Sequence, residues 1–222
     1  MKLAALTSGG KDSILAIWKA KEAGHEVCAM ISVIPENPES YMFHAANLAA
    51  VPVMAERSNM VYIPVHTAGE KEDEVEDLKR ALAAAKETYG IEGVTSGAIA
   101  SEYQRSRVSR IFEELGLVHI APLWRASPDA VIADAAALLD ARIVVTAADG
   151  LGENVLGKRI DEELIRVLKA VEKKRRINVA GEGGEYESLV LDAPFFSEAV
   201  HAEGAEVRFE GMRGVVTYTR FW

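Results

Sequence analysis

Short apolar runs alternate with amphipathic stretches through the first half of this chain. Strands are predicted near residues 2–7, 27–34, 61–65, 93–97 and 118–121. Helices are predicted between them, near residues 11–23, 44–57, 72–89 and 104–115. Gly24 and Gly90 follow two of these helices, at the place of a C-terminal glycine cap. The alternation favours a five-stranded parallel sheet with helices on both faces, a Rossmann-like α/β fold.

The pattern changes after Pro122-Leu123-Trp124. A helix near 127–140 is expected, with Ser127 as its N-cap and Pro128 at its first position. Further elements are predicted as strands near 142–146, 177–180, 189–191, 206–209 and 215–221 and a helix near 161–175. We therefore expect a nucleotide-binding domain at 1–125 and a smaller, mixed α+β domain for substrate binding at 126–222.

Composition narrows the class of protein. The chain has 222 residues, 49% of them hydrophobic and 27% charged, which is ordinary for a well-packed globule. The first strand begins at once, which leaves no room for a signal peptide, and no apolar run is long enough to span a membrane, so a cytoplasmic protein is expected. A single cysteine, Cys28, permits neither a disulfide framework nor a CxxC metal site. It also disfavours sulfur-transfer chemistry, which commonly uses cysteine pairs.

The net charge of −9 disfavours a nucleic-acid partner, because an acidic surface repels phosphates. One basic cluster is an exception to this acidic net charge: Lys169, Lys173, Lys174, Arg175 and Arg176. Cations at the end of a predicted helix are stabilised by the helix dipole, so a solvated helix end is the simpler interpretation. Docking of a macromolecular partner stays open.

The segment from Ser8 to Ser13 (the glycine loop, SGGKDS) joins the first strand to the first helix. Backbone N–H groups and the helix N-terminus converge there, which favours an anion. Gly9 and Gly10 allow a phosphate to approach the backbone, and Lys11 adds a positive charge. Because parallel sheets bind ligands beyond the carboxyl ends of their strands, the segments after Ile34 and Thr95 should line the same crevice. The spacing differs from a Walker A loop.

A second unusual stretch runs from Gly181 to Ser188 (the acidic segment, GEGGEYES). Its three carboxylates repel one another unless a cation or shared protons offset the repulsion. A solvated acidic turn between two strands is the alternative interpretation.

The glycine loop resembles the pyrophosphate loop of the N-type ATP pyrophosphatases, which have a HUP-type nucleotide-binding sheet. The acidic segment and the following Leu189–Pro194 closely resemble the C-terminal signature of the diphthine–ammonia ligase family, which also begins with SGGKDS. Further stretches that look like this family lie at 40–44, 96–107, 122–124 and 150–158. Ser188 stands where the family usually has threonine, and Ala45-Ala46 replaces a usual Thr-Pro. The length is that of the short archaeal forms.

The resemblance implies amidation of diphthine, a modified histidine on translation elongation factor 2, by ammonia with ATP and Mg²⁺. The carboxylate would be adenylated, pyrophosphate would leave, and ammonia would attack the acyl-adenylate to give diphthamide and AMP. Expected partners are the modified elongation factor and ammonium, with neither a nucleic acid nor a membrane, and a homodimer is left open.

The resemblance also implies a role for each motif. The glycine loop would hold the β and γ phosphates, with Lys11 and Asp12 also catalytic and Asp12 binding Mg²⁺. Its residues are Ser8, Gly9, Gly10, Lys11, Asp12 and Ser13. Backbone groups at Ile31 and Ser32 would contact the adenine, and Gly97 would admit the ribose or α-phosphate.

The remaining candidates face the substrate. Tyr103, Gln104 and Arg107 would orient the substrate carboxylate or stabilise the transition state. Diphthine bears a trimethylammonium group, which suits an acidic and aromatic site. The residues expected there are Glu182, Gly183, Gly184, Glu185, Tyr186 and Glu187, with Glu185 and Glu187 as catalytic candidates. His44 is a further candidate, although an ordinary structural histidine explains it equally well.

Two rival functions remain. One is an ATP pyrophosphatase that modifies tRNA, against which the acidic charge and the lone cysteine count. The other is a non-catalytic ATP-binding protein, which would have no need of the acidic segment.

Overall fold

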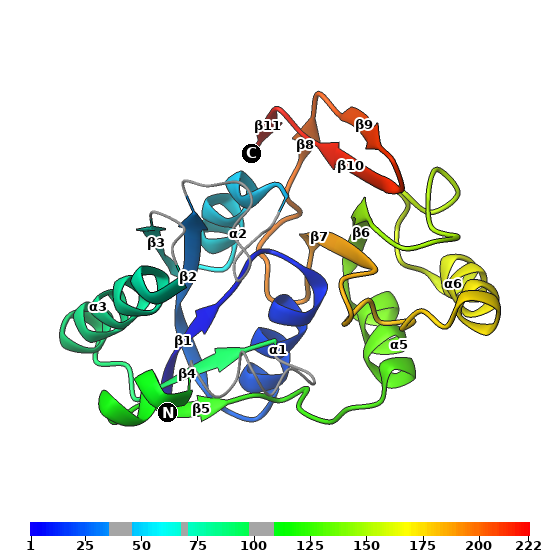
Figure 1. The fold of residues 1–222 in the computed structure, drawn as a ribbon. Coiled ribbons are helices and arrows are strands. Elements are labelled where there is room, and N and C mark those ends of the chain that lie inside the picture. Colours follow the sequence, from blue (N-terminus) through cyan, green and yellow to red (C-terminus); the bar gives the residue numbers. More distant parts are fainter. Residues whose placement is uncertain (36–45, 68–70, 98–108) are drawn as a thin grey trace.

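A computed structural model describes residues 1–35, 46–67, 71–97 and 109–222 of the chain. The described residues form two larger sheets and one two-stranded sheet, with helices packed around and between the larger two (Figure 1). The first sheet carries the N-terminus, and the second contains the last long strands of the chain.

The first sheet is parallel throughout, with the strand order β3-β2-β1-β4-β5. Its strands are β1 (Lys2–Leu6), β2 (Glu26–Pro35), β3 (Val61–Thr67), β4 (Gly93–Ser96) and β5 (Val118–Ile120). The expected five-stranded Rossmann-like sheet is therefore confirmed. The central strand β1 is nearly all apolar because both of its faces are covered.

Helices cover both faces of this sheet. The helix α1 (Lys11–Glu22) and the shorter α2 (Val51–Arg57) pack on one face with Leu3 and Met30. The helix α3 (Lys71–Tyr89) and a helical stretch at 109–114 pack on the other face with Ala4 and Val94. The positive φ angles of Gly24 and Gly90, which follow α1 and α3, agree with their expected capping role.

The helix expected near 44–57 begins later among the described residues, and residues 44 and 45 lie outside them. Residues 46 and 47 form a turn, a 3₁₀ turn (Leu48–Ala50) follows, and α2 begins only at Val51. Asn47 has a left-handed φ of 66°, and its side chain donates to the Val216 carbonyl (2.9 Å) and accepts the Tyr218 N–H (2.9 Å). These contacts hold the segment in a turn.

The second sheet is antiparallel, with the strand order β7-β6-β10-β9. Its strands are β6 (Asp140–Thr146), β7 (Tyr186–Asp192), β9 (Glu206–Glu210) and β10 (Arg213–Thr217), and two short strands, β8 (Ala202–Glu203) and β11 (Arg220–Phe221), pair separately. The helices of this part are α5 (Pro128–Leu138) and α6 (Glu162–Arg175). Ser127 caps α5 as expected, by accepting the Ala130 N–H (3.2 Å).

Three boundaries in this part differ from expectation. Residues 177–180 form no strand, because Asn178 folds them into a turn: its side chain accepts the Ala180 N–H and its carbonyl accepts the Gly181 N–H. The expected strand 215–221 is split, since residues 220–221 pair with β8 and not with the second sheet. The helix α5 ends at Leu138, and Asp140 already begins β6.

One buried cluster runs across the junction of the two parts. Leu15 of α1, Ile132 of α5 and Val190 of β7 all belong to it. The second sheet is thereby fixed against the helix that follows the glycine loop. In the described part of the chain, no helix is long and apolar enough to cross a membrane.

Candidate active site

The glycine loop follows β1 at the carboxyl edge of the first sheet and is braced by a chain of hydrogen bonds. The Gly9 N–H donates to Thr7 Oγ1 (2.9 Å), which lies 2.8 Å from Ser13 Oγ. The Ser13 hydroxyl donates to the Gly10 carbonyl (2.9 Å), so its one proton is used there and Thr7 is the donor to Ser13. Sequence reasoning missed Thr7, although its place directly after a buried strand was a usable signal.

Ile31 and Ser32 belong to this brace. The Ile31 carbonyl accepts the Thr7 N–H (2.9 Å), and the Ser32 hydroxyl donates to the Thr7 carbonyl (2.7 Å). Both residues are buried. Their predicted contact with adenine stays a prediction, and these atoms already hold the end of β1 in place.

The glycines of the site are required for different reasons. Gly9 has a φ of +78°, which a residue with a side chain rarely adopts. A Cβ on Gly10 would lie 3.2 Å from the Ser188 carbonyl oxygen, and one on Gly97 would lie 2.5 Å from the Ser13 backbone nitrogen. Close packing of protein backbone therefore explains Gly10 and Gly97. The predicted approach of ATP to Gly97 stays a prediction.

Lys11 is buried, with 3% of its surface exposed, although it carries a charge. Its Nζ lies 2.8 and 3.0 Å from the two carboxylate oxygens of Asp12. It also lies 5.3 Å from the centre of the Tyr186 ring. A buried ammonium needs such compensation, and the ion pair together with the ring face supplies it.

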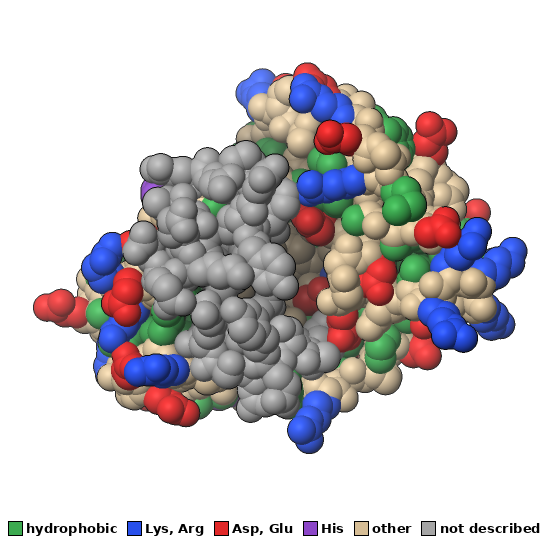
Figure 2. All heavy atoms as spheres, viewed as in Figure 1, with side chains coloured by type: hydrophobic (Ala, Val, Ile, Leu, Met, Phe, Trp, Pro, Cys, Tyr) green, Lys and Arg blue, Asp and Glu red, His purple; other side chains and the backbone are tan. Residues whose placement is uncertain are grey.

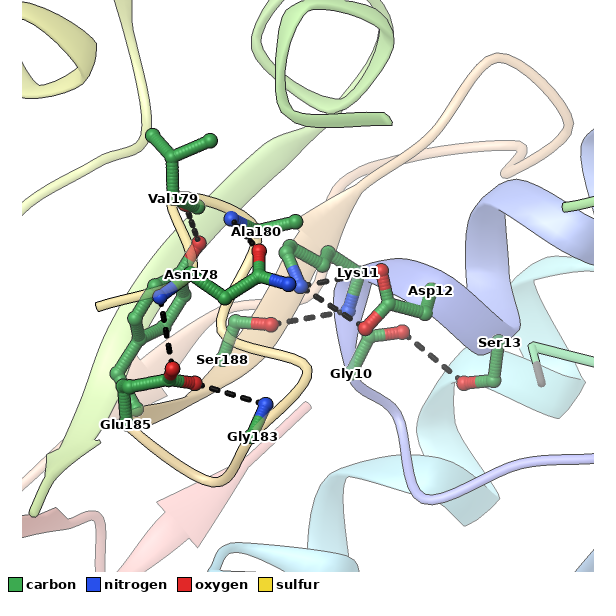
Figure 3. Close-up of polar contacts among 11 residues, drawn as sticks. Gly10, Lys11, Asp12, Ser13, Asn178, Val179, Ala180, Gly183, Glu185 and Ser188 are labelled. Carbon is green, nitrogen blue, oxygen red and sulfur yellow. Dashed lines mark hydrogen bonds and ion pairs between the residues drawn. The ribbon is translucent and has the colours of Figure 1, made fainter. Parts of the chain in front are cut away.

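The second sheet meets the glycine loop through β7. The Lys11 N–H donates to Ser188 Oγ (3.0 Å), and the Val190 N–H donates to the Gly9 carbonyl (2.9 Å). Figure 3 shows the Ser188 side chain directed at the Lys11 backbone nitrogen. Two motifs separated by about 170 residues of sequence are thus joined in one site. In the described part of the chain, the N–H groups of Gly10 and Asp12 have no acceptor, and both suit an anion.

Glu185 folds the acidic segment upon itself. Its Oε1 accepts the Asn178 N–H (2.7 Å) and its Oε2 accepts the Gly183 N–H (2.8 Å), as Figure 3 shows. The Tyr186 hydroxyl donates to the Val179 carbonyl (2.8 Å), and Gly181, with a φ of +76°, lies flat against the Tyr186 ring. The segment is a structured turn that supports the ring beside Lys11. It is not a solvated acidic turn between two consecutive strands, because the strand expected at 177–180 does not form.

Burial and the nearby charges raise the pKa of two side chains in the site. Burial raises the pKa of Glu182, and the carboxylates of Asp12 and Glu185 raise it further, while Lys11 acts in the opposite direction. Burial raises the pKa of the Tyr186 phenol well above its ordinary value, with the nearby carboxylates adding to the effect. Oε1 of Glu182 is buried and has no hydrogen-bond partner among the described residues.

The other predicted residues are placed less completely. Oε2 of Glu187 accepts the Ala46 N–H at 3.4 Å, and Gly184 is exposed with a φ of +82°. Ser8 is exposed at the start of the glycine loop. His44, Tyr103, Gln104 and Arg107 lie outside the described residues. No group of three or more metal-ligating side chains occurs among the residues described, and the predicted binding of Mg²⁺ by Asp12 stays a prediction.

Comparison with known proteins agrees with this arrangement. Residues 1–119 match the model of the diphthamide synthase N-terminal domain, and residues 127–221 match that of the C-terminal domain. The chain is 34% identical to the human diphthine–ammonia ligase over all of this chain and 91% of that protein, and 35% identical to the bovine enzyme over 93% of this chain and 85% of that protein. The fission yeast enzyme of the same name is 32% identical over 99% of this chain and 39% of its own length.

Proposed function

Since this chain belongs to the diphthamide synthase family of ligases, we propose that it amidates the carboxylate of diphthine on translation elongation factor 2. The reaction uses ATP and ammonia and yields diphthamide, AMP and pyrophosphate. The observation that carries the proposal is the junction of the glycine loop with the acidic segment through Lys11, Ser188 and Tyr186. An anion-binding loop and a carboxylate-rich surface are both needed for this reaction, and here they share one site.

The chemistry requires activation, because a carboxylate would have to lose oxide to react with ammonia directly. A substrate carboxylate oxygen attacks the α-phosphorus of ATP, and the bond to the β-phosphate oxygen breaks. Ammonia then attacks the acyl carbon, the bond to AMP breaks, and a proton leaves the nitrogen. Lys11 and the N–H groups of Gly10 and Asp12 stabilise the charge on the departing pyrophosphate. Asp12 would hold Mg²⁺, which would neutralise charge on the phosphate oxygens.

The three glutamates of the acidic segment have different roles in this proposal. Both oxygens of Glu185 are used by main-chain N–H groups, so Glu185 positions the segment and is not the base. Glu182 has a buried oxygen without a hydrogen-bond partner among the described residues and a raised pKa, which suits a group that binds ammonium and accepts its proton. Glu187 contacts the substrate, and His44, which lies outside the described residues, is a further candidate for that contact. Tyr103, Gln104 and Arg107 orient the carboxylate that is activated.

The test is release of AMP and pyrophosphate from ATP with ammonium and elongation factor 2 that bears diphthine. Lys11→Ala should lower kcat/KM by at least about a thousandfold, because it removes the only side-chain cation of the glycine loop. Arg80→Ala on the exposed face of α3 serves as the control and should keep full activity. Formation of ADP in place of AMP, or stimulation by tRNA and not by the modified factor, would contradict the proposal.

A further inference from the structure

A basic cluster marks the C-terminal end of α6. It consists of Lys173, Lys174, Arg175 and Arg176, all of them exposed. Figure 2 shows basic side chains gathered over α6, on the right of the view. This concentration occurs in a chain with a net charge of −9.

Most of the cluster lacks acidic partners. Arg175 pairs with Asp149 at 3.3 Å, and the earlier Lys169 pairs with Asp129 at 2.8 Å. Lys173, Lys174 and Arg176 have no ion pair among the described residues. The helix dipole stabilises cations within the last turn, but Arg176 already lies beyond it, with a left-handed φ of 56°. Lys173 and Lys174 lie in that last turn, and Arg176 adds a further cation beyond it that has no ion pair among the described residues.

The cluster is continuous with the candidate active site. Ile177 is buried, and the next residue, Asn178, donates its N–H to Glu185 of the acidic segment. Two residues of chain span at most about 7 Å, so Arg176 lies close to the turn that carries Glu185. The cluster therefore ends two residues before the backbone N–H that holds the acidic segment.

We propose that the end of α6 is a docking surface for an acidic segment of the protein substrate, next to the residue that is modified. This proposal rests on the proposed function and adds the surface by which the substrate protein is recognised. Exposed cations at the rim of a site mainly speed association and set its salt dependence. A protein segment fits better than RNA, because four basic residues at one helix end do not follow a long phosphate backbone and the chain as a whole has a net charge of −9.

The test is the double charge reversal Lys173→Glu/Lys174→Glu. The KM for the modified elongation factor should rise about tenfold at low salt and by less than about twofold at high salt, because the Debye length falls with ionic strength. The KM for ATP should stay unchanged. Lys173→Gln/Lys174→Gln, which removes the charges without adding acids to the helix end, should show a smaller rise in the same direction.

The matched control is Arg80→Glu/Arg110→Glu, which makes the same charge change on exposed positions of α3 and the 109–114 helix. It should leave the KM for the protein substrate unchanged. An unchanged KM in both α6 variants, an equal rise in the control, or a loss confined to tRNA binding would overturn the docking surface. Direct binding of the factor to the wild-type chain and to the variants separates this outcome from a failure of the proposed function, which would leave AMP formation absent in the wild-type chain.

Discussion

The two motifs of the site are held in opposite ways. The glycine loop is braced by hydroxyl groups and main-chain atoms of β1, β2 and α1, which leaves backbone N–H groups and one ammonium for an anion. The acidic segment is braced by a carboxylate, because Glu185 uses both of its oxygens on main-chain N–H groups. A carboxylate in such a motif can therefore have a structural role, as Glu185 does here. The number of acids in a segment does not tell how many of them reach the substrate.

The largest effect on stability should come from Glu185→Ala. It leaves the N–H groups of Asn178 and Gly183 without an acceptor and releases the turn that supports Tyr186, so the free energy of unfolding should fall by about 2–3 kcal/mol. Glu182→Ala, which removes no hydrogen bond among the described residues, should change it by less than about 0.5 kcal/mol. Urea unfolding of both variants measures the difference. Equal losses would show that the two glutamates are not divided between structure and chemistry.

The first sheet was predictable to a large extent. Its strands are continuous apolar runs between clear helical patterns, and capping residues such as Gly24 and Ser127 fix the helix ends locally. One error arose where a distant contact decides the backbone: Asn47 is turned by hydrogen bonds with Val216 and Tyr218, 169 and 171 residues further along the chain. A single sequence contains no sign of such a pairing. The error at 177–180 is local, because the side chain of Asn178 accepts the N–H two residues ahead, and asparagine is a turn signal that the sequence does carry.

The candidate site was predictable as a set of motifs but not as a network. The glycine loop depends on main-chain geometry, which the pattern of glycines before a helix specifies. The division between Glu182 and Glu185 depends on which carboxylate meets a free N–H, and that becomes visible only in the folded chain. Gly10 was expected to let a phosphate approach the backbone, yet it also borders the backbone of β7.

An intermediate effect should follow from Ser188→Ala. The substitution removes the acceptor of the Lys11 N–H at the contact between β7 and the glycine loop, so stability should fall by about 1 kcal/mol. The KM for ATP should change as well, because the first turn of α1 loses its contact with the second sheet. Ser188→Thr keeps the hydroxyl group and should restore both values. Thermal unfolding and ATP titration of the two variants measure this, and failure of the threonine variant to restore them would contradict a role for the hydroxyl.

The smallest effect concerns the pH dependence of stability at Glu182. Burial first, and then the carboxylates of Asp12 and Glu185, raise its pKa above the unfolded value, so the folded state binds the proton more tightly. Its contribution to stability is fully present below the unfolded pKa and is lost as pH rises through the folded pKa. Glu182→Gln cannot ionise, so it should gain stability relative to the wild-type chain as pH rises from below about 4 toward neutrality.

Glu87→Gln, on the exposed face of α3, serves as the control for the loss of one acidic side chain. Urea unfolding across that pH range measures the difference between each variant and the wild-type chain. A Glu182→Gln difference that stays constant with pH would mean that the buried oxygen carries no excess cost of ionisation. This result would contradict the proposal that Glu182 is the proton acceptor. The acidic segment would then retain only the structural role that Glu185 gives it.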